Sequence, residues 1–277
     1  QGMEVALPGG AGAHNWQPMA YSPQTGLVYI PAQYIPFPYV DDKKFQYRPG
    51  RWNMGVDLGA VPPPATAGDV EAARTAMHGA LIAWNPVTQS LAWQVDQARP
   101  VNGGVLATAG GLVFQGLGGD GHFVAYDAGD GKELWRFDSQ SGIVAAPMSY
   151  RIGDTQYVAV LAGYGGAIAL ALPDVHKERP RMNGRLLAFK LGGAAKLPAP
   201  PDLLPFNVTA EALPPALVAK GSAQFAANCS GCHSAGVLSA NVTPDLRRSS
   251  FLGSSEGWRS VVIDGALEER GMVSFRS

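Results

Sequence analysis

Cysteine and charge are both scarce in this chain: it has two cysteines in 277 residues, and charged residues make up 16%. No second thiol pair is present to complete a four-thiolate zinc or iron–sulfur site. The net charge is -1 and there is no basic block, which argues against a nucleic-acid binder or a protein of anionic membrane surfaces. The most apolar run, residues 158–173, is too short and too rich in glycine to predict a membrane span.

An initiator methionine and an apolar leader are also absent. The chain opens at Gln1, and residues 27–30 soon have the pattern of a strand inside a fold. We therefore expect a piece of a longer protein, whose N-terminal portion carries any export signal.

Glycine and proline, by contrast, are abundant. The 35 glycines and 22 prolines predict frequent turns, and hydrophobic residues at 46% allow a sizeable core. This composition favours an all-β body over a helical one, and the length allows two domains.

A repeat indicates how that body is built. The pattern of residues 79–85, followed by Trp93, recurs in residues 121–127, followed by Trp135, at an offset of 42 residues. A period near forty predicts one four-stranded propeller blade per repeat. We expect each tryptophan to pack on the neighbouring blade. A weaker third copy occupies residues 184–190, and three copies cannot close a ring.

Two other stretches interrupt the blade pattern. Residues 38–76 lack periodicity, and we expect a long excursion from the sheets that serves as a binding element. Residues 192–215 are rich in proline and predict a semi-rigid linker. Apolar residues at helical spacing then predict a helix that begins near Pro215 and ends on the next motif. A further helix-like segment spans residues 256–266.

The chemistry-bearing motif is Cys229-Ser230-Gly231-Cys232-His233. Two thiols three positions apart, followed by a histidine, are typical of c-type haem attachment, with both thiols bonded to the porphyrin and the imidazole as an axial ligand. The alternatives are a thioredoxin-type redox pair or half of a shared metal site. A redox pair is expected near a βαβ pattern, which the surrounding sequence lacks.

Met272 is the candidate for the second axial ligand of the iron. It is the only methionine after the motif, 39 residues beyond His233, and no later histidine competes with it. The alternative is that Met272 fills a gap in the core. Because the chain ends at Ser277, where a small cytochrome normally adds another helix, we expect a C-terminal truncation.

Taken together, these stretches resemble the C-terminal part of the soluble quinohaemoprotein alcohol dehydrogenases. In that family, an eight-bladed propeller that binds pyrroloquinoline quinone (PQQ) is joined by a proline-rich linker to a cytochrome c domain. The matching stretches are His14–Met19, the two blade motifs, Gly142–Pro147, Leu161–Gly166, Cys229–His233 and Gly271–Phe275.

The resemblance implies a mainly β fold: a partial eight-bladed β-propeller followed by a small all-α cytochrome c domain that is truncated at its C-terminus. Residues 1–191 would be the C-terminal blades of the propeller, residues 192–215 the linker and residues 216–277 the cytochrome c domain.

It also implies which residues bind the cofactors. Asn15 would hydrogen-bond a quinone-side oxygen of PQQ, Trp16 would line its edge, and Val144 would approach the quinone through its backbone. The alternative is that Trp16 belongs to the core and Asn15 to a turn. Cys229 and Cys232 would hold haem c covalently, with His233 and Met272 on its iron.

Other parts of the family's chemistry have no counterpart here. The resemblance places the calcium ligands, the catalytic aspartate and a vicinal disulfide in upstream blades, so no catalytic residue is expected in this chain. The ending Phe275-Arg276-Ser277 also departs from the family's apolar continuation.

The function implied is PQQ-dependent oxidation of a small primary or secondary alcohol. Electrons pass within the protein to haem c and on to an external acceptor such as a copper protein or a cytochrome. Covalent haem points to the periplasm, and we expect this piece to be inactive alone. The alternative is a cytochrome c electron-transfer or scaffold protein with a non-catalytic propeller, which would not need Asn15 and Trp16. A PQQ-independent assembly factor gives no reason for a linked haem domain.

Overall fold

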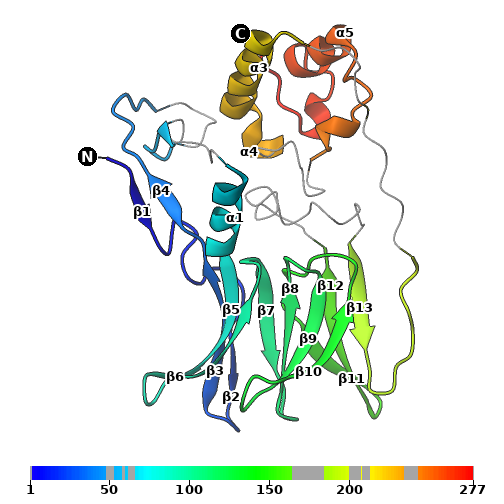
Figure 1. Ribbon diagram of the computed structural model, residues 1–277. Helices are drawn as coiled ribbons and strands as arrows, with labels where there is room; N and C mark the ends of the chain where they lie inside the picture. Colours follow the sequence, from blue (N-terminus) through cyan, green and yellow to red (C-terminus); the bar gives the residue numbers. More distant parts are fainter. Residues whose placement is uncertain are drawn as a thin grey trace. The chain divides into compact units, whose positions relative to one another are not determined.

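The computed structural model of the chain describes residues 2–47, 53–57, 60–61, 66–163, 184–199, 207, 213–233 and 243–276. The chain divides into two compact units. One contains the residues up to 163 together with 184–197; the other contains 198–277 together with 164–183, of which the last range lies outside the described residues. In Figure 1 the first unit carries the β-sheets, and the second carries the helices α3 to α5.

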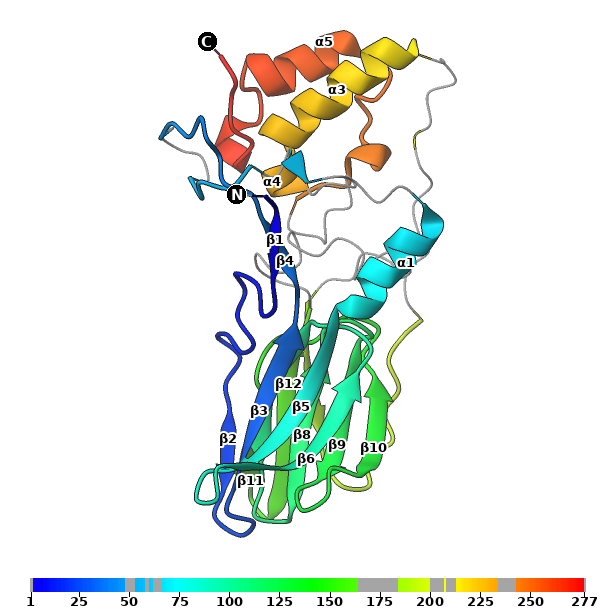
Figure 2. The same cartoon turned by 60° about the vertical axis from the view of Figure 1, so that its left-hand side comes forward.

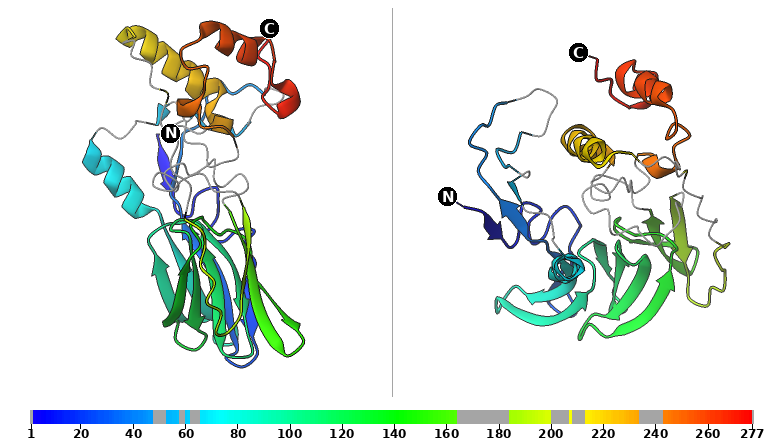
Figure 3. Two further views of the ribbon diagram at one scale, coloured as in Figure 1. Left: turned by 90° about the vertical axis from the view of Figure 1, so that its right-hand side faces the viewer. Right: turned by 45° about the horizontal axis from the view of Figure 1, so that its top comes forward.

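Three antiparallel sheets make up most of the first unit. The first sheet has the order β2 (Ala20–Ser22), β3 (Leu27–Tyr34), β5 (His78–Asn85), β6 (Ser90–Gln97). The second runs β7 (Asn102–Ala107), β8 (Leu112–Leu117), β9 (His122–Asp127), β10 (Glu133–Asp138). The third contains β11 (Met148–Ile152), β12 (Thr155–Ala162) and β13 (Arg185–Phe189). Figure 3 shows the three sheets following one another around the unit.

The repeat predicted these sheets correctly. The first copy of the pattern falls on β5 and β6, and the second falls on β9 and β10, so each copy supplies the last two strands of a four-stranded sheet. The weaker third copy falls on β13. Four antiparallel neighbours in chain order are the arrangement of a propeller blade.

Strand alternation fills the two cores between the sheets. On β9, Val124 and Tyr126 face the cluster shared with the first sheet, which includes Tyr29 and Leu81. Phe123, the residue directly before Val124, belongs instead to the cluster shared with the third sheet. Because successive side chains point to opposite faces, the middle sheet joins both neighbours.

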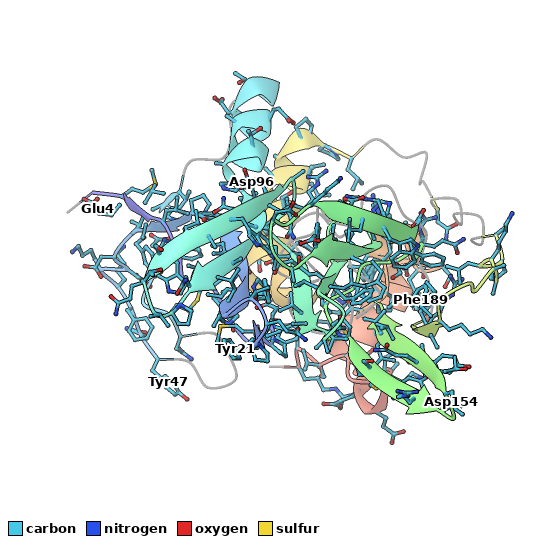
Figure 4. All side chains as sticks on the ribbon, turned by 90° about the horizontal axis from the view of Figure 1, so that it is seen from below. Glu4, Tyr21, Tyr47, Asp96, Asp154 and Phe189 are labelled. Atoms are coloured by element: carbon cyan, nitrogen blue, oxygen red, sulfur yellow. The ribbon has the colours of Figure 1, made fainter. Side chains whose placement is uncertain are left out.

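The two repeated tryptophans pack between sheets, as expected. Trp93 of β6 donates from its indole Nε1 to the carbonyl of Ala128, 3.2 Å away, just beyond β9. Trp135 of β10 meets Phe189 of β13 edge to face at a centroid distance of 5.2 Å. The labelled Phe189 lies among crowded side chains in Figure 4. Both tryptophans therefore link one sheet to the next.

The long excursion between β3 and β5 contains structure that its sequence did not predict. β4 (Phe37–Tyr39) pairs with β1 (Glu4–Ala6) as a two-stranded ribbon, and α1 (Ala67–Ala76) runs directly into β5 (Figure 2). Thr66 and Asp69 form a reciprocal cap at the start of α1: the Asp69 N–H donates to the Thr66 hydroxyl, and the Thr66 N–H donates to the Asp69 carboxylate. This capping pair is the sequence feature that indicates the start of α1.

The described part of the second unit contains helices and no strand. The predicted helix is present as α3 (Pro215–Asn228), followed by α4 (Ser230–His233). The other helical segments are η3 (Leu246–Arg248), α5 (Ser255–Trp258), the π-helical η4 (Arg259–Ile263) and η5 (Glu268–Arg270). The helix-like pattern of residues 256–266 thus corresponds to α5 and η4. None of the described helices has the length and apolar character needed to cross a membrane.

Candidate haem and quinone sites

The two cysteines lie on one turn of helix directly after α3. The carbonyl of Cys229 accepts from the N–H of Cys232 at 3.1 Å and from the N–H of His233 at 2.9 Å. Cys229 is half-buried, Cys232 is exposed, and no disulfide joins them. A spacing of three residues places the two thiols on the same face of a helical turn. Two neighbouring thiols facing one side suit covalent attachment to the edge of a porphyrin.

His233 is the buried member of the motif, with 7% of its surface exposed. Its Nδ1 lies 3.3 Å from the carbonyl oxygen of Pro244. Burial lowers the pKa of His233, and the Pro244 carbonyl opposes this only in part. A lowered pKa favours the neutral imidazole. If Nδ1 carries the proton, it donates to the Pro244 carbonyl and leaves Nε2 open to a metal, which is the usual arrangement of a metal-binding histidine.

Met272 lies in a loop that is anchored on η4. Gly271 before it has a φ of 89°, a left-handed conformation that glycine adopts without strain. The N–H of Met272 donates to Leu267, and on its other side the N–H of Phe275 donates to Val262 at 2.8 Å. The loop is thus fixed on both sides of the thioether. That this thioether reaches the iron stays a prediction.

These donors fit a c-type haem. Two thiols on one turn, a buried imidazole and a half-buried methionine are the groups that such a haem uses. A thioredoxin-type pair would need no buried histidine directly after its second cysteine.

On the quinone side, Asn15 and Trp16 are both exposed, and Trp16 has 53% of its surface accessible, so neither belongs to the core. Asn15 donates from Nδ2 to the carbonyl of Ala11 at 2.9 Å, and its Oδ1 accepts from the N–H of Trp16 at 2.8 Å. His14 fixes the segment to β3, because its Nδ1 lies 2.8 Å from the carbonyl oxygen of Pro31. These two bonds hold the Asn15 amide in place.

Val144, by contrast, is buried. Its segment and the Trp16 segment converge on β7 at Gly104. A Cβ on Gly104 would lie 2.7 Å from Cδ of Pro18 and 2.9 Å from Cβ of Ala146. The structure therefore brings the two predicted quinone-binding segments to one strand, and only a glycine leaves room for both.

Sequence reasoning missed two residues here. Gly104 was given no role, although the Gly103-Gly104 pair at a strand start signals a close backbone approach. Gln17 was quoted only as part of a motif. It is 2% exposed, and both polar atoms of its side chain lack a hydrogen-bond partner among the described residues.

No cluster of three or more His, Cys, Asp or Glu side chains that could hold a metal occurs in the part of the chain that the structure describes. That the family's calcium ligands and catalytic aspartate belong to upstream blades stays a prediction.

Comparison with known families agrees with this arrangement. The β-propeller domain of the glucose/ethanol/alcohol dehydrogenases (PQQ) matches residues 62–158. The cytochrome c family matches residues 218–262, which include the cysteine–histidine motif.

Individual relatives combine the two parts. The chain is 41% identical to the dehydrogenase subunit of the quinone alcohol dehydrogenase of Acetobacter aceti, over 97% of this chain and 37% of the relative. The crystal structure of the quinohaemoprotein alcohol dehydrogenase of Comamonas testosteroni matches with a TM-score of 0.76 and 37% identity, over 99% of this chain and 39% of that one. The ADHIIG structure from Pseudomonas putida HK5 gives a TM-score of 0.81 and 35% identity, over 98% and 40%. The chain thus spans well under half the length of these relatives. With its propeller sheets, its Cys229–His233 motif and these matches, the chain is similar to a part of the quinohaemoprotein alcohol dehydrogenases that joins propeller blades to a cytochrome c domain.

Proposed function

We propose that this chain takes part in PQQ-dependent oxidation of a small primary or secondary alcohol, as one wall of the quinone pocket and as the electron exit. The observation that carries the proposal is the buried His233, whose Nδ1 faces the Pro244 carbonyl one helical turn from two cysteines. The relatives named as alcohol dehydrogenases support the substrate class.

Bound PQQ would supply the oxidation of the alcohol, and haem c would supply one-electron transfer. The residues of this chain would bind and orient the two cofactors. The side-chain amide of Asn15 would donate a hydrogen bond to a quinone oxygen, the Trp16 ring would form an aromatic wall, and the Val144 backbone, between β10 and β11, would close the pocket. His233 and Met272 would hold the haem iron.

Other components of the reaction would come from outside this chain. We place the calcium ion and the catalytic base in regions of the family that this chain does not span, so the chain alone should not oxidise alcohol. The electron acceptor is an external copper protein or cytochrome. Covalent haem attachment supports a periplasmic location.

A chimera tests the proposal. The segment of the Comamonas testosteroni enzyme that corresponds to this chain is replaced by residues 1–277, and the protein is matured with haem and loaded with PQQ and calcium. Addition of a small alcohol should then reduce the haem, as followed by its visible absorption. The matched control carries Cys229→Ala and Cys232→Ala, which remove the covalent haem attachment.

Two results are decisive. Alcohol-dependent haem reduction that is lost in Asn15→Ala supports both the quinone wall and the electron exit. A chimera that carries covalent haem and binds PQQ, but shows no alcohol-dependent reduction, would favour the scaffold reading and contradict the proposal.

A further inference from the structure

The carbonyl that faces His233 belongs to a tightly anchored turn, residues 243–249. At its start, the hydroxyl of Thr243 donates to the carbonyl of Cys232 at 2.9 Å, the residue directly before His233. Pro244 follows and presents its carbonyl to the imidazole. The turn is thus attached to the haem motif at two adjacent points.

Asp245 fixes the middle of this turn. Its carboxylate accepts the N–H of Arg247 as the cap of η3, and it pairs with the Arg247 guanidinium at 3.0 and 2.8 Å and with Arg248 at 3.4 Å. Burial opposes ionisation of Asp245, but the bonds and charges from the two arginines outweigh it and lower its pKa. The carboxylate therefore stays charged and keeps the turn closed.

The third anchor comes from a residue far away in the sequence. Asn207 donates its backbone N–H to the carbonyl of Arg247 at 2.9 Å. Its side-chain Nδ2 donates to the carbonyls of Arg248 at 3.0 Å and Ser249 at 3.1 Å. One residue of the predicted linker thus satisfies three successive carbonyls at the end of the turn.

We propose that Asn207 is a positioning residue for the haem: it holds the 243–249 turn so that Pro244 keeps its hydrogen bond to His233, and so lowers the reduction potential of the iron. The inference rests on the haem binding of the proposed function. A histidine ligand that donates its other N–H is a stronger electron donor to the metal and stabilises the oxidised state. Loosening the turn weakens this hydrogen bond and raises the potential.

The test uses the haem-loaded protein and Asn207→Ala, which removes the two side-chain bonds and leaves the backbone bond intact. Thr243→Val loosens the other end of the same turn, and serves if Asn207→Ala does not fold. Ser222→Ala, at an exposed position of α3, is the matched control. We measure the reduction potential by spectroelectrochemistry, the exchange rate of the His233 Nδ1 proton by NMR, and the melting temperature.

We expect a positive shift of the potential and faster Nδ1 proton exchange in Asn207→Ala and in Thr243→Val, with neither change in Ser222→Ala. A lower melting temperature with unchanged potential and exchange would make Asn207 a structural anchor only and overturn the inference. Absence of covalent haem from the wild-type protein is a different result: it would overturn the haem site of the proposed function itself.

Discussion

Three buried amide side chains tie the first two sheets together. Gln97 of β6 donates to Gln115 of β8 at 2.7 Å, and Asn102 of β7 donates to Gln97 at 3.1 Å and to the carbonyl of Ala32 on β3 at 2.8 Å. Each amide depends on the next, because a buried amide without a partner costs about 1–3 kcal/mol.

Gln115→Leu should therefore destabilise the first unit by about 1–3 kcal/mol, since it leaves the Gln97 amide without its partner. The control is Gln156→Leu at an exposed position of β12. The free energy of unfolding from urea titration measures both. Equal effects of the two substitutions would show that the buried amides contribute nothing specific.

Tyr126, in the same region, gives a prediction about alkaline pH. Burial raises its pKa to about 12, whereas an unfolded tyrosine titrates near 10. The folded state favours the protonated phenol, so its contribution to stability is complete below pH ~10 and is lost as the pH rises towards ~12, by at most about 3 kcal/mol.

Tyr126→Phe should flatten this part of the stability profile between pH ~10 and ~12. Unfolding measured at steps of pH in wild type and variant checks it. An equally steep loss of stability in Tyr126→Phe would assign the alkaline transition to other groups.

At the scale of elements, the close approach at Gly104 holds two segments against β7. Gly104→Ala places a methyl group against Pro18 and Ala146, and overpacking of this kind costs about 1–3 kcal/mol. Because both predicted quinone-binding segments must move, the free energy of PQQ binding in the chimera should weaken by more than the free energy of unfolding does.

Gly110→Ala is the control for this prediction, since a Cβ there meets nothing closer than 3.9 Å. Equilibrium titration of PQQ compares the two variants. Unchanged PQQ affinity in Gly104→Ala would show that the close approach at Gly104 does not shape the quinone site.

Some helices and strands of this chain could be predicted from its sequence, and others could not. The blade strands and α3 carry regular periodicity together with turn and proline signals, and the structure has them where the pattern indicated. α1 has only a weakly apolar face, so its capping residues Thr66 and Asp69 were the sole signal. The partners of Asn207 and Gly104 could not be predicted, because periodicity assigns faces to strands and helices but does not pair segments distant in sequence.

At the scale of the whole molecule, the chain combines a β unit whose sheets share two cores with a helical unit that carries the haem motif. The quinone candidates Asn15, Trp16 and Val144 lie in the first unit; Cys229 to His233 and Met272 lie in the second. The function proposed here needs both units. Its central claim is that His233 and Met272, 39 positions apart in the sequence, bind the iron of one haem.

The most direct measurement is the visible and near-infrared spectrum of the chain, produced with a cytochrome c maturation system, for wild type and Met272→Ala. We predict a covalent low-spin haem whose weak sulfur-to-iron charge-transfer band in the oxidised state disappears in Met272→Ala. A wild-type protein without covalent haem, or a band that persists in Met272→Ala, would contradict the assignment of Cys229, Cys232, His233 and Met272 to one haem.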